Sequence, residues 1–297
     1  MAGSPRRRRD RAPPPGPGTR PRRLRPSRQT TLRSRAVQLD ERFRRDYSAL
    51  AARLADWTGN YVRQAGFSRV VIGVSGGVDS ALSAALAARA LGAENVHGLL
   101  LPHAASDPAS ERDGRLVCEH LGLPHERLEI TPYCAPLLNE IPESDRIRRG
   151  NIKARMRMII LFDYSEKLPA LVLGTGNKTE ILLGYATLHG DNACGLDPLA
   201  ELYKTEIWEL ARELELPQVV IDKTPTADLW AGQTDEGELG ISYRSADPIL
   251  YDHAEGGLDR DGLISAGHPA TAVDHLLGIV SRTAFKRHLP AHPPSYR

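Results

Sequence analysis

The stretch VVIGVSGGVDSALSAALAARAL, residues 70–91, constrains the fold more than any other part of the sequence. It starts with a β-branched apolar run, turns through Gly76 and Gly77, and ends in an alanine- and leucine-rich segment typical of a helix. Glycines in such a turn let backbone amides approach a ligand, and the helix N-terminus adds free N–H groups and the positive end of its dipole. The stretch therefore predicts an anion site, which most often holds phosphate.

Two common phosphate motifs do not match this turn. A Walker A loop requires Lys after its last glycine, and the glycines at 73, 76 and 77 have the wrong spacing for GxGxxG. Asp79 would repel a phosphate unless a cation lay between them, so it predicts Mg²⁺. The alternative is an ordinary strand–turn–helix corner in which Asp79 only starts the helix.

Apolar runs without polar alternation recur along the chain, as expected for strands that are buried on both faces of a parallel sheet. They lie at 69–74, 96–102, 126–130 and 170–174. Helical patterns accompany them at 37–66, 79–91, 108–121, 146–168 and 177–186. This alternation predicts an α/β fold with a doubly wound, Rossmann-like parallel sheet, helices on both faces, and ligands at the carboxyl ends of the strands.

Charge divides the chain into two parts. Residues 1–35 hold 12 of the 39 Lys and Arg residues and one acid, a net +11, so the remaining 27 bases and 36 acids give −9. We expect a disordered Arg/Pro-rich tail at 1–36 and a single α/β domain at 37–297. The tail has no aromatic residue for base stacking, which argues against nucleic acid as a partner. A transit peptide is an alternative function for it.

The remaining composition indicates a cytoplasmic protein. Cys118, Cys134 and Cys194 are odd in number and widely spaced, so they predict neither a disulfide framework nor a zinc site. No apolar run approaches the roughly 18–20 residues that a membrane span needs. We therefore expect no membrane partner.

The hexapeptide SGGVDS resembles the pyrophosphate loop of the ATP pyrophosphatases, which transfer AMP from ATP to a substrate oxygen. Four later stretches make the resemblance specific to the ammonia-dependent NAD synthetase family over residues 37–294. They are GNIKARMRMIILFDYSEKLPALVLGTGNKTEILLGYATLHGDNAC from residue 150, DPLAELYKTEIWELA from 197, KTPTADLWAGQTDEGELGISY from 223, and FKRHLPAHPP from 285.

This resemblance implies a ligase that amidates deamido-NAD with ammonia through an acyl adenylate, releasing AMP and pyrophosphate. It implies ATP as co-substrate, Mg²⁺ as cofactor and a homodimer, with helices 37–66 and 146–168 as interface candidates. The residues before the loop are too few for the glutaminase domain of glutamine-dependent relatives, so we expect free ammonia. A tRNA-modifying enzyme of the same superfamily and a non-catalytic nucleotide sensor are the alternatives.

Carried over position by position, the resemblance implies the site residues. For ATP they are Gly73, Val74, Ser75, Gly76, Gly77, Val78, Asp79, Ser80, Thr175, Lys204 and Thr226. For deamido-NAD they are Arg155, Lys286 and Arg287, and for Mg²⁺ they are Asp79 and Glu180. We assign catalytic roles to Asp79, Lys204 and Asp191, and infer that Asp191 takes a proton from ammonium; a structural turn Asp is the alternative. Leu188 and Gly195 depart from the Lys and Asp that are common in the family.

Residues 224–240 are rich in Gly, Thr and Asp. They predict a mobile loop that closes over ATP and keeps water from the adenylate. We call this segment the lid.

Overall fold

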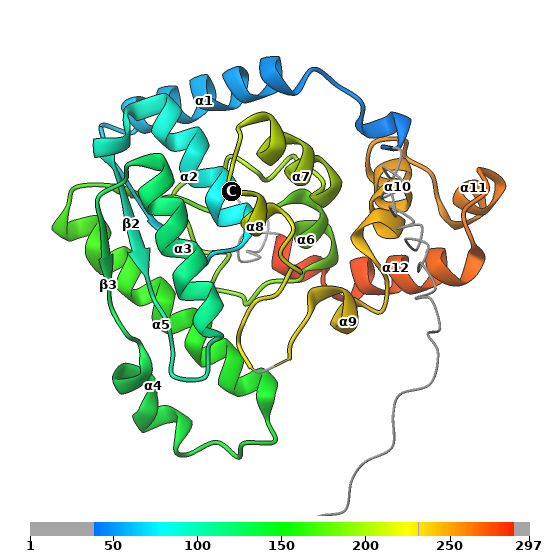
Figure 1. The fold of residues 1–297 in the computed structure, drawn as a ribbon. Coiled ribbons are helices and arrows are strands. Elements are labelled where there is room, and N and C mark those ends of the chain that lie inside the picture. The colour runs from blue at the N-terminus through cyan, green and yellow to red at the C-terminus, as the bar shows by residue number, and fades with distance from the viewer. Residues whose placement is uncertain (1–38, 231, 288–297) are drawn as a thin grey trace, which may run out of the picture. The chain divides into compact units, whose positions relative to one another are not determined.

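The computed structural model describes residues 39–230 and 232–287 (Figure 1). The predicted tail at 1–36 and the domain boundary at 37 lie outside these residues, so they stay predictions. In the described part of the chain, no helix is both long enough and apolar enough to span a bilayer.

Four parallel strands form the sheet, in the order β3-β2-β1-β4. They are β1 (Val70–Gly73), β2 (Val96–Leu100), β3 (His125–Arg127) and β4 (Leu171–Val172). Val70 pairs with Val96 on one side and with Leu171 on the other. The predicted α/β fold with a parallel sheet is confirmed, although the apolar runs at 126–130 and 170–174 are strand over only part of their lengths.

Helices surround the sheet and form most of the second half of the chain. The α-helices are α1 (Tyr47–Gln64), α2 (Val78–Leu91), α3 (Pro108–Leu121), α4 (Thr131–Leu138), α5 (Arg146–Lys167), α6 (Lys178–Leu183), α7 (Lys204–Glu213), α8 (Gln218–Ile221), α9 (Asp235–Leu239), α10 (Tyr243–Ala254), α11 (Arg260–Ser265) and α12 (Ala270–Arg282). Short 3-10 helices are η1 (Glu41–Phe43), η2 (Ala93–Asn95) and η3 (Ala284–Arg287).

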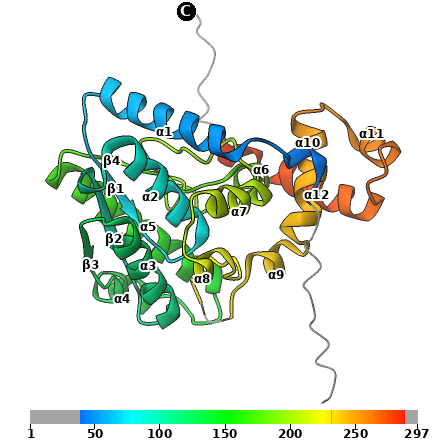
Figure 2. The ribbon, with the colours of Figure 1, turned by 45° about the horizontal axis from the view of Figure 1, so that its top comes forward.

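Alternate residues of β1 enter two different hydrophobic cores. Val70 and Ile72 pack with α2 and the second half of the chain, whereas Val71 packs with Ile160 and Tyr164 of α5. The helices α2 and α3 thus lie on one face of the sheet and α5 on the other, and α1 lies against α2 (Figure 1, Figure 2). Burial on both faces explains why the strands lack polar alternation.

The strand order reverses between β1 and β4. From β1 the chain proceeds through β2 to β3 in one direction, and it then returns through α5 to β4 on the opposite side of β1. In doubly wound sheets, ligands bind beside such a switch point, at the carboxyl ends of the strands.

The predicted helix at 37–66 is wrong at its beginning. Within the described residues, α1 starts only at Tyr47, where the Asp46 carboxylate caps it by accepting from Ala49 N at 2.9 Å. The preceding turn directs Phe43 into the core, with ring centroids 5.6 Å from Tyr203 and 5.8 Å from Tyr251. The Asp46 cap and the burial of Phe43 therefore explain why the helix is shorter at its N-terminus than the spacing predicted.

Candidate active site

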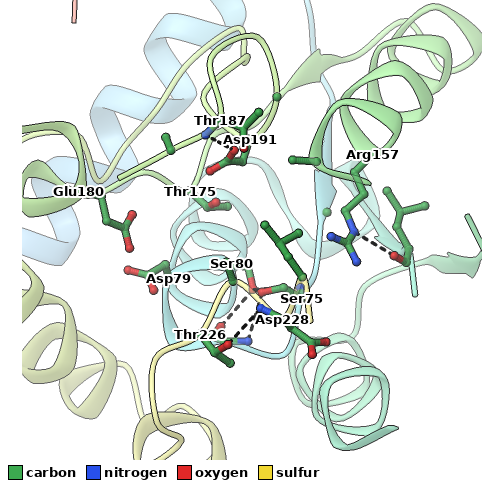
Figure 3. Close-up of a pocket in the computed structure, with 18 of the residues that line it drawn as sticks. Ser75, Asp79, Ser80, Arg157, Thr175, Glu180, Thr187, Asp191, Thr226 and Asp228 are labelled. Atoms are coloured by element: carbon green, nitrogen blue, oxygen red, sulfur yellow. Dashed lines mark hydrogen bonds between the residues drawn. The ribbon is translucent and has the colours of Figure 1, made fainter. Parts of the chain in front are cut away.

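A cleft of about 440 Å³ opens at the carboxyl ends of β1, β2 and β4. Its size suits a small-molecule ligand. Most of the predicted site residues line it: Gly73, Val74, Ser75, Gly77, Val78, Asp79, Ser80, Thr175, Glu180, Asp191, Lys204, Thr226 and Lys286. Figure 3 shows Asp79 and Glu180 facing one another on one side of this cleft, with Arg157 on the opposite side. Three predicted residues, Gly76, Arg155 and Arg287, are not part of its lining.

The loop between β1 and α2 is held by its own hydroxyl groups. Ser80 Oγ donates to Gly77 O at 3.0 Å and accepts from Ser75 N at 3.2 Å. Ser75 Oγ lies 3.0 Å from Ser80 Oγ and accepts from Gly77 N at 3.3 Å. These bonds fix the turn, while Gly77 starts α2 without a side-chain cap, so the helix retains unpaired amides for an anion.

Gly76 is required for a different reason than the sequence suggested. Its φ is +78°, and a Cβ there would lie 2.3 Å from Ser110 O of α3. The residue therefore allows the turn to pack against α3 rather than against a ligand. Gly77, which does line the cleft, is the glycine that leaves a ligand free access.

Lys204 lies between two carboxylates at the centre of the site. Its Nζ is 2.5 Å from Asp79 Oδ2 and 3.6 Å from Glu180 Oε1. The side chain is buried, and the two acids raise its pKa despite the burial. The ammonium group therefore stays charged, because each of these buried charges has a partner.

Glu180 is placed by the start of α6. Asn177 caps this helix and Glu180 completes a capping box, accepting from Asn177 N at 3.3 Å. Asn177 Nδ2 also donates to Asp79 Oδ1 at 2.9 Å, which ties the second glycine-rich turn to the first. The pKa of Glu180 is raised to about 8, chiefly by burial; Asp79 and Asp235 act in the same direction, and Lys204 opposes them.

The acid-rich side of the cleft has the chemistry of a Mg²⁺ site. Asp79, Glu180 and Asp235 line it together with one cation, Lys204, so negative charge is in excess there. Carboxylate oxygens are the ligands that Mg²⁺ prefers, with phosphate and water completing its shell. Among residues 39–230 and 232–287, no three acid, His or Cys side chains are close enough together to hold a metal alone. The residues therefore fit a Mg²⁺ ion that is shared with a bound phosphate.

A buried carboxylate on α10, which the sequence analysis did not single out, supports both Glu180 and Lys204. Asp247 is fully buried and accepts from Thr179 Oγ1 at 2.7 Å, Thr205 Oγ1 at 2.6 Å and Thr205 N at 2.7 Å. Thr179 precedes Glu180, and Thr205 follows Lys204. Asp247 therefore fixes the first turns of α6 and α7 relative to each other.

Asp191 and Lys286 lie at another part of the cleft. The Asp191 carboxylate accepts from Thr187 N at 2.8 Å. Although Asp191 has exposed surface, protein atoms enclose its carboxyl, and this desolvation raises its pKa. Lys286 Nζ donates to Gly184 O at 2.8 Å and to Ala186 O at 2.7 Å, so its ammonium group stands close to the same loop.

The two remaining predicted arginines contact backbone carbonyls. Arg155 is exposed and donates to Leu188 O from Nε at 3.2 Å and from Nη2 at 3.1 Å. Arg287 donates to Leu182 O and Val280 O, both at 2.7 Å. Neither reaches the cleft in this structure, so their contacts with deamido-NAD stay predictions.

The lid lies over the cleft and is attached on several sides. Asp228 Oδ1 accepts from Asp107 N at 3.0 Å, and Lys153 Nζ donates to Leu229 O at 2.6 Å. At its far end, α9 carries Asp235 and Glu238, which lie 3.1 Å and 2.6 Å from the Tyr185 hydroxyl. The last part of the predicted loop is therefore a short helix.

Several residues that line the cleft lie within the stretches quoted above but were assigned no site role from the sequence. They are Arg157, Tyr185, Lys223, Asp228, Gln233, Asp235 and Glu238. Arg157 Nε donates to Leu101 O at 3.0 Å. The helical periodicity of α5 was only a partial signal for Arg157. It places a base on one side of an amphipathic helix beside the switch point, but it does not show whether that side faces the cleft or the solvent.

A parallel sheet with a glycine loop at its switch point and an acid-rich cleft is typical of nucleotide-binding α/β enzymes. The chain matches the NAD synthase family over residues 50–290. It is 48% identical over 225 residues to the NH3-dependent NAD+ synthetase of Trichlorobacter lovleyi, covering 76% of this chain and 82% of that relative. It is 46% identical over 243 residues to the enzyme of the same name from Wolinella succinogenes, covering 82% and 94%. The chain belongs to the NAD synthase family.

Solved structures agree with this assignment. The NMN synthetase of Francisella tularensis superposes with a TM-score of 0.74 at 30% identity, over 84% of this chain and 99% of that one. The NH3-dependent NAD synthetase of Campylobacter jejuni, solved with a nitrate ion, gives 0.71 at 32% identity, over 84% and 100%.

Proposed function

We propose that this protein is an ammonia-dependent NAD synthetase, a ligase that uses ATP to amidate deamido-NAD to NAD. One observation carries the proposal: the loop 73–80, apart from Gly76, lines one cleft at the switch point together with Glu180 and Lys204, which lie far from it in the sequence. The family membership and the two relatives named above support the same reaction. The tRNA-modifying alternative has no support from either source.

In this mechanism the loop holds the phosphates of ATP. The amides of Gly77 and the following residues, the hydroxyls of Ser75 and Ser80, and the ammonium of Lys204 face the region where negative charge accumulates as pyrophosphate departs. Thr175 and Thr226 line the same cleft and add hydroxyl groups. The nicotinate carboxylate attacks the α-phosphorus, which activates it as an acyl adenylate.

Asp79 and Glu180 would hold Mg²⁺, and the ion would neutralise phosphate charge during the transfer. Lys204 contacts the same two carboxylates, so it keeps them in place and shares the charge with the ligand. Because the pKa of Glu180 is raised to about 8 even with Lys204 beside it, a further cation such as Mg²⁺ would keep its carboxyl ionised at neutral pH.

Asp191 is the residue that we assign to the second step, in which ammonia attacks the adenylate carbonyl. Burial makes its carboxylate more basic than an ordinary Asp, which helps it to take a proton from ammonium. Lys286 stands near the same loop and would offset the charge of the dinucleotide. The lid excludes water, which would otherwise hydrolyse the adenylate.

The proposed reaction is tested by incubating the protein with ATP, Mg²⁺, deamido-NAD and ammonium. We expect NAD, AMP and pyrophosphate in equal amounts. Nicotinate mononucleotide is supplied in a parallel reaction, because the Francisella structure is an NMN synthetase. Release of ADP, AMP formation without any need for deamido-NAD, or turnover of the mononucleotide alone would each contradict the proposal.

Two further properties belong to the proposal. The protein acts as a cytoplasmic homodimer, and the candidate interface helices carry exposed apolar side chains: Trp57 and Tyr61 on α1, and Ile159 and Phe162 on α5. Exposed aromatic residues are typical of interfaces. Light scattering on the purified protein measures its mass directly, and a monomer at micromolar concentration would exclude the dimer.

A further inference from the structure

A second cavity, of about 270 Å³, lies beside the main cleft. It is bounded by α5, by the loop after β2 and by the lid. Its lining residues are His103, Ala105, Glu143, Arg146, Arg149, Lys153, Leu229 and Trp230. Three of these side chains are basic and one is a carboxylate, so the formal charge of the lining is +2 with His103 neutral. We call it the α5 cavity.

The bases of the α5 cavity are held by carbonyl groups instead of acids. Lys153 is 5% exposed, and its Nζ donates to Leu229 O at 2.6 Å. Arg149 Nη1 donates to Leu138 O and Ile141 O, both at 2.7 Å. Within the part of the chain that the structure describes, neither base has a carboxylate oxygen within ion-pair distance. Their charge is therefore hydrogen-bonded but not neutralised.

Unneutralised charge of this kind is unfavourable in a partly buried cavity. Its effect is visible at two neighbouring groups. Burial, Arg157 and Arg149 lower the pKa of Lys153, and burial together with Lys153 lowers the pKa of His103 to about 4. His103 is thus neutral at physiological pH, chiefly because it is buried and also because Lys153, Arg157 and Arg149 surround it. An anion in the cavity would relieve this repulsion.

The spacing of the bases indicates what kind of anion fits. Arg146, Arg149 and Lys153 lie at positions i, i+3 and i+7 of α5, along one side of the helix. Seven residues of α-helix span about 10 Å. Side chains that start along this length can converge on an anion with charged oxygens at both ends more readily than on a single compact phosphate. The volume is also too small for a dinucleotide, since pockets for drug-sized ligands begin at about 300 Å³.

We propose that the α5 cavity is a second anion site, which takes inorganic pyrophosphate or a phosphate chain of similar length. It is separate from the loop 73–80, because the two cavities share only the lid residues Leu229 and Trp230 in their linings. Gly150 allows this arrangement: a Cβ there would lie 3.1 Å from both side chains. A bound anion would compete with Leu229 O for Lys153 and so affect the contact that holds the lid.

Isothermal titration of the full chain with inorganic pyrophosphate tests the proposal without turnover, so its result does not depend on the proposed reaction. We expect two binding sites in the wild-type protein. A non-hydrolysable ATP analogue, α,β-methylene-ATP, should displace pyrophosphate from the loop only. The double variant Arg146→Glu, Lys153→Met should weaken the remaining site by at least about tenfold, because charged hydrogen-bond donors are lost.

Arg148→Glu is the matched control. Arg148 lies on the same helix and is also exposed, but it pairs with Asp145 and does not line the cavity. It should leave both sites intact. Arg146 is exposed, and its side chain makes no hydrogen bond or ion pair with the described residues, so Arg146→Glu alone serves as a second variant should the double variant fail to fold. One site in the wild type, complete displacement by the ATP analogue, or equal weakening by Arg148→Glu would overturn the proposal.

Discussion

Glu180 and Asp79 are held near each other by Lys204, and the removal of one charge tests how the three act together. Glu180→Gln keeps the size of the side chain and an oxygen that can accept from Asn177 N, so α6 should stay capped. It removes a carboxylate from the proposed Mg²⁺ site. We expect NAD formation to fall by at least about 100-fold, as for the loss of one group that stabilises transition-state charge.

The measurement is the initial rate of NAD formation as a function of Mg²⁺ concentration. Partial recovery at high Mg²⁺ is expected for Glu180→Gln, because a weakened site is filled by mass action. Glu209→Gln is the control, since Glu209 lies on α7 but pairs with Arg212 and does not line the cleft. A wild-type rate in Glu180→Gln at low Mg²⁺ would remove Glu180 from the metal site.

Protonation of the Asp197 carboxyl should make the free energy of unfolding depend on pH. Its carboxylate accepts from Gly176 N at 3.1 Å and from Leu199 N at 3.2 Å, and burial raises its pKa from 3.8 to about 7. Between these two values the folded state binds a proton that the unfolded state does not bind. Stability therefore falls as pH rises through this window, by at most about 1.4 kcal/mol per pH unit for one group.

Asp197→Asn should remove this contribution to the dependence of the free energy of unfolding on pH. Urea unfolding of both proteins at pH 4, 5, 6 and 7 measures it, and the variant should gain stability relative to the wild type as the pH increases. The comparison isolates Asp197, because every other titrating group is common to both proteins. Parallel stability profiles would show that the carboxyl ionises normally in the folded state.

The residues proposed to bind phosphate could be located from the sequence because they form one local unit. Strand, glycine turn and helix are contiguous, so Ser75, Gly77 and Asp79 were found from their spacing alone. Asp247 and Asp235 could not be found in this way. Their partners Thr179 and Tyr185 are distant in the sequence, and nothing in the residues around the two acids indicates that they approach these groups.

Contacts of α10 with α6 and α7 depend on Asp247. Three donors converge on its carboxylate, from Thr179 and Thr205. Asp247→Ala leaves them buried without a partner, at about 1–3 kcal/mol each. We expect a loss of roughly 3–5 kcal/mol in the free energy of unfolding, because part of the loss is recovered by relaxation. Chemical denaturation measures it.

The same variant should also lower kcat more than it raises KM, because Glu180 and Lys204 lose their fixed positions rather than their charges. Asp252→Ala is a suitable comparison: Asp252 is also on α10 but pairs with Arg42, away from the cleft. It should reduce stability without a matching effect on kcat. Equal kcat values for Asp247→Ala and the wild type would limit Asp247 to a structural role.

The contacts that attach the lid through α9 should determine how much of the adenylate is hydrolysed by water instead of being converted to NAD. The Tyr185 hydroxyl lies 2.6 Å from Glu238 Oε2 and 3.1 Å from Asp235 Oδ1. Tyr185→Phe removes the hydroxyl, whose single proton makes one hydrogen bond to a carboxylate at a time, worth about 1.5–3 kcal/mol. With a looser lid, water reaches the adenylate, so AMP should exceed NAD severalfold instead of matching it.

Product ratios from one reaction give this result without reference to absolute rates. Tyr133→Phe, at an exposed position of α4 outside the cleft, should keep the ratio at one. If Tyr185→Phe also kept the ratio at one, the α9 contacts would not contribute to the exclusion of water.

The sequence predicted that these helices exist, but it did not predict where they begin and end. The expected helix at 177–186 ends at Gly184, which adopts a left-handed conformation with φ of 59°. The expected helix at 37–66 is interrupted before Asp46, although Leu39, Phe43 and Tyr47 have helical spacing. Periodicity indicates which side chains are buried, and Phe43 is indeed buried. It does not indicate that Phe43 packs against Tyr203 and Tyr251, outside a continuous helix.

These contacts connect the beginning of the described chain to its second half. Phe43 is fully buried between α7 and α10, and Arg42 makes a two-pronged ion pair with Asp252, at 2.8 Å for both bonds. Figure 1 shows the segment before α1 reaching α10, while α1 itself runs back over α2. The N-terminal segment thus joins the sheet half of the molecule to the helices that position Lys204 and Asp247.

Truncation at two positions tests this connection. A chain that begins at residue 36 keeps Arg42 and Phe43 and should match the full protein in melting temperature and in NAD formation. A chain that begins at residue 46 loses both, and the loss of a buried Phe alone is worth about 3–5 kcal/mol. We expect it to melt at a clearly lower temperature, and Phe43→Ala in the full chain should reproduce most of the difference. Equal stability of the two truncated chains would show that the contacts of Phe43 and Arg42 do not hold the two halves together, and a large loss already at residue 36 would show that the basic tail contributes to the fold.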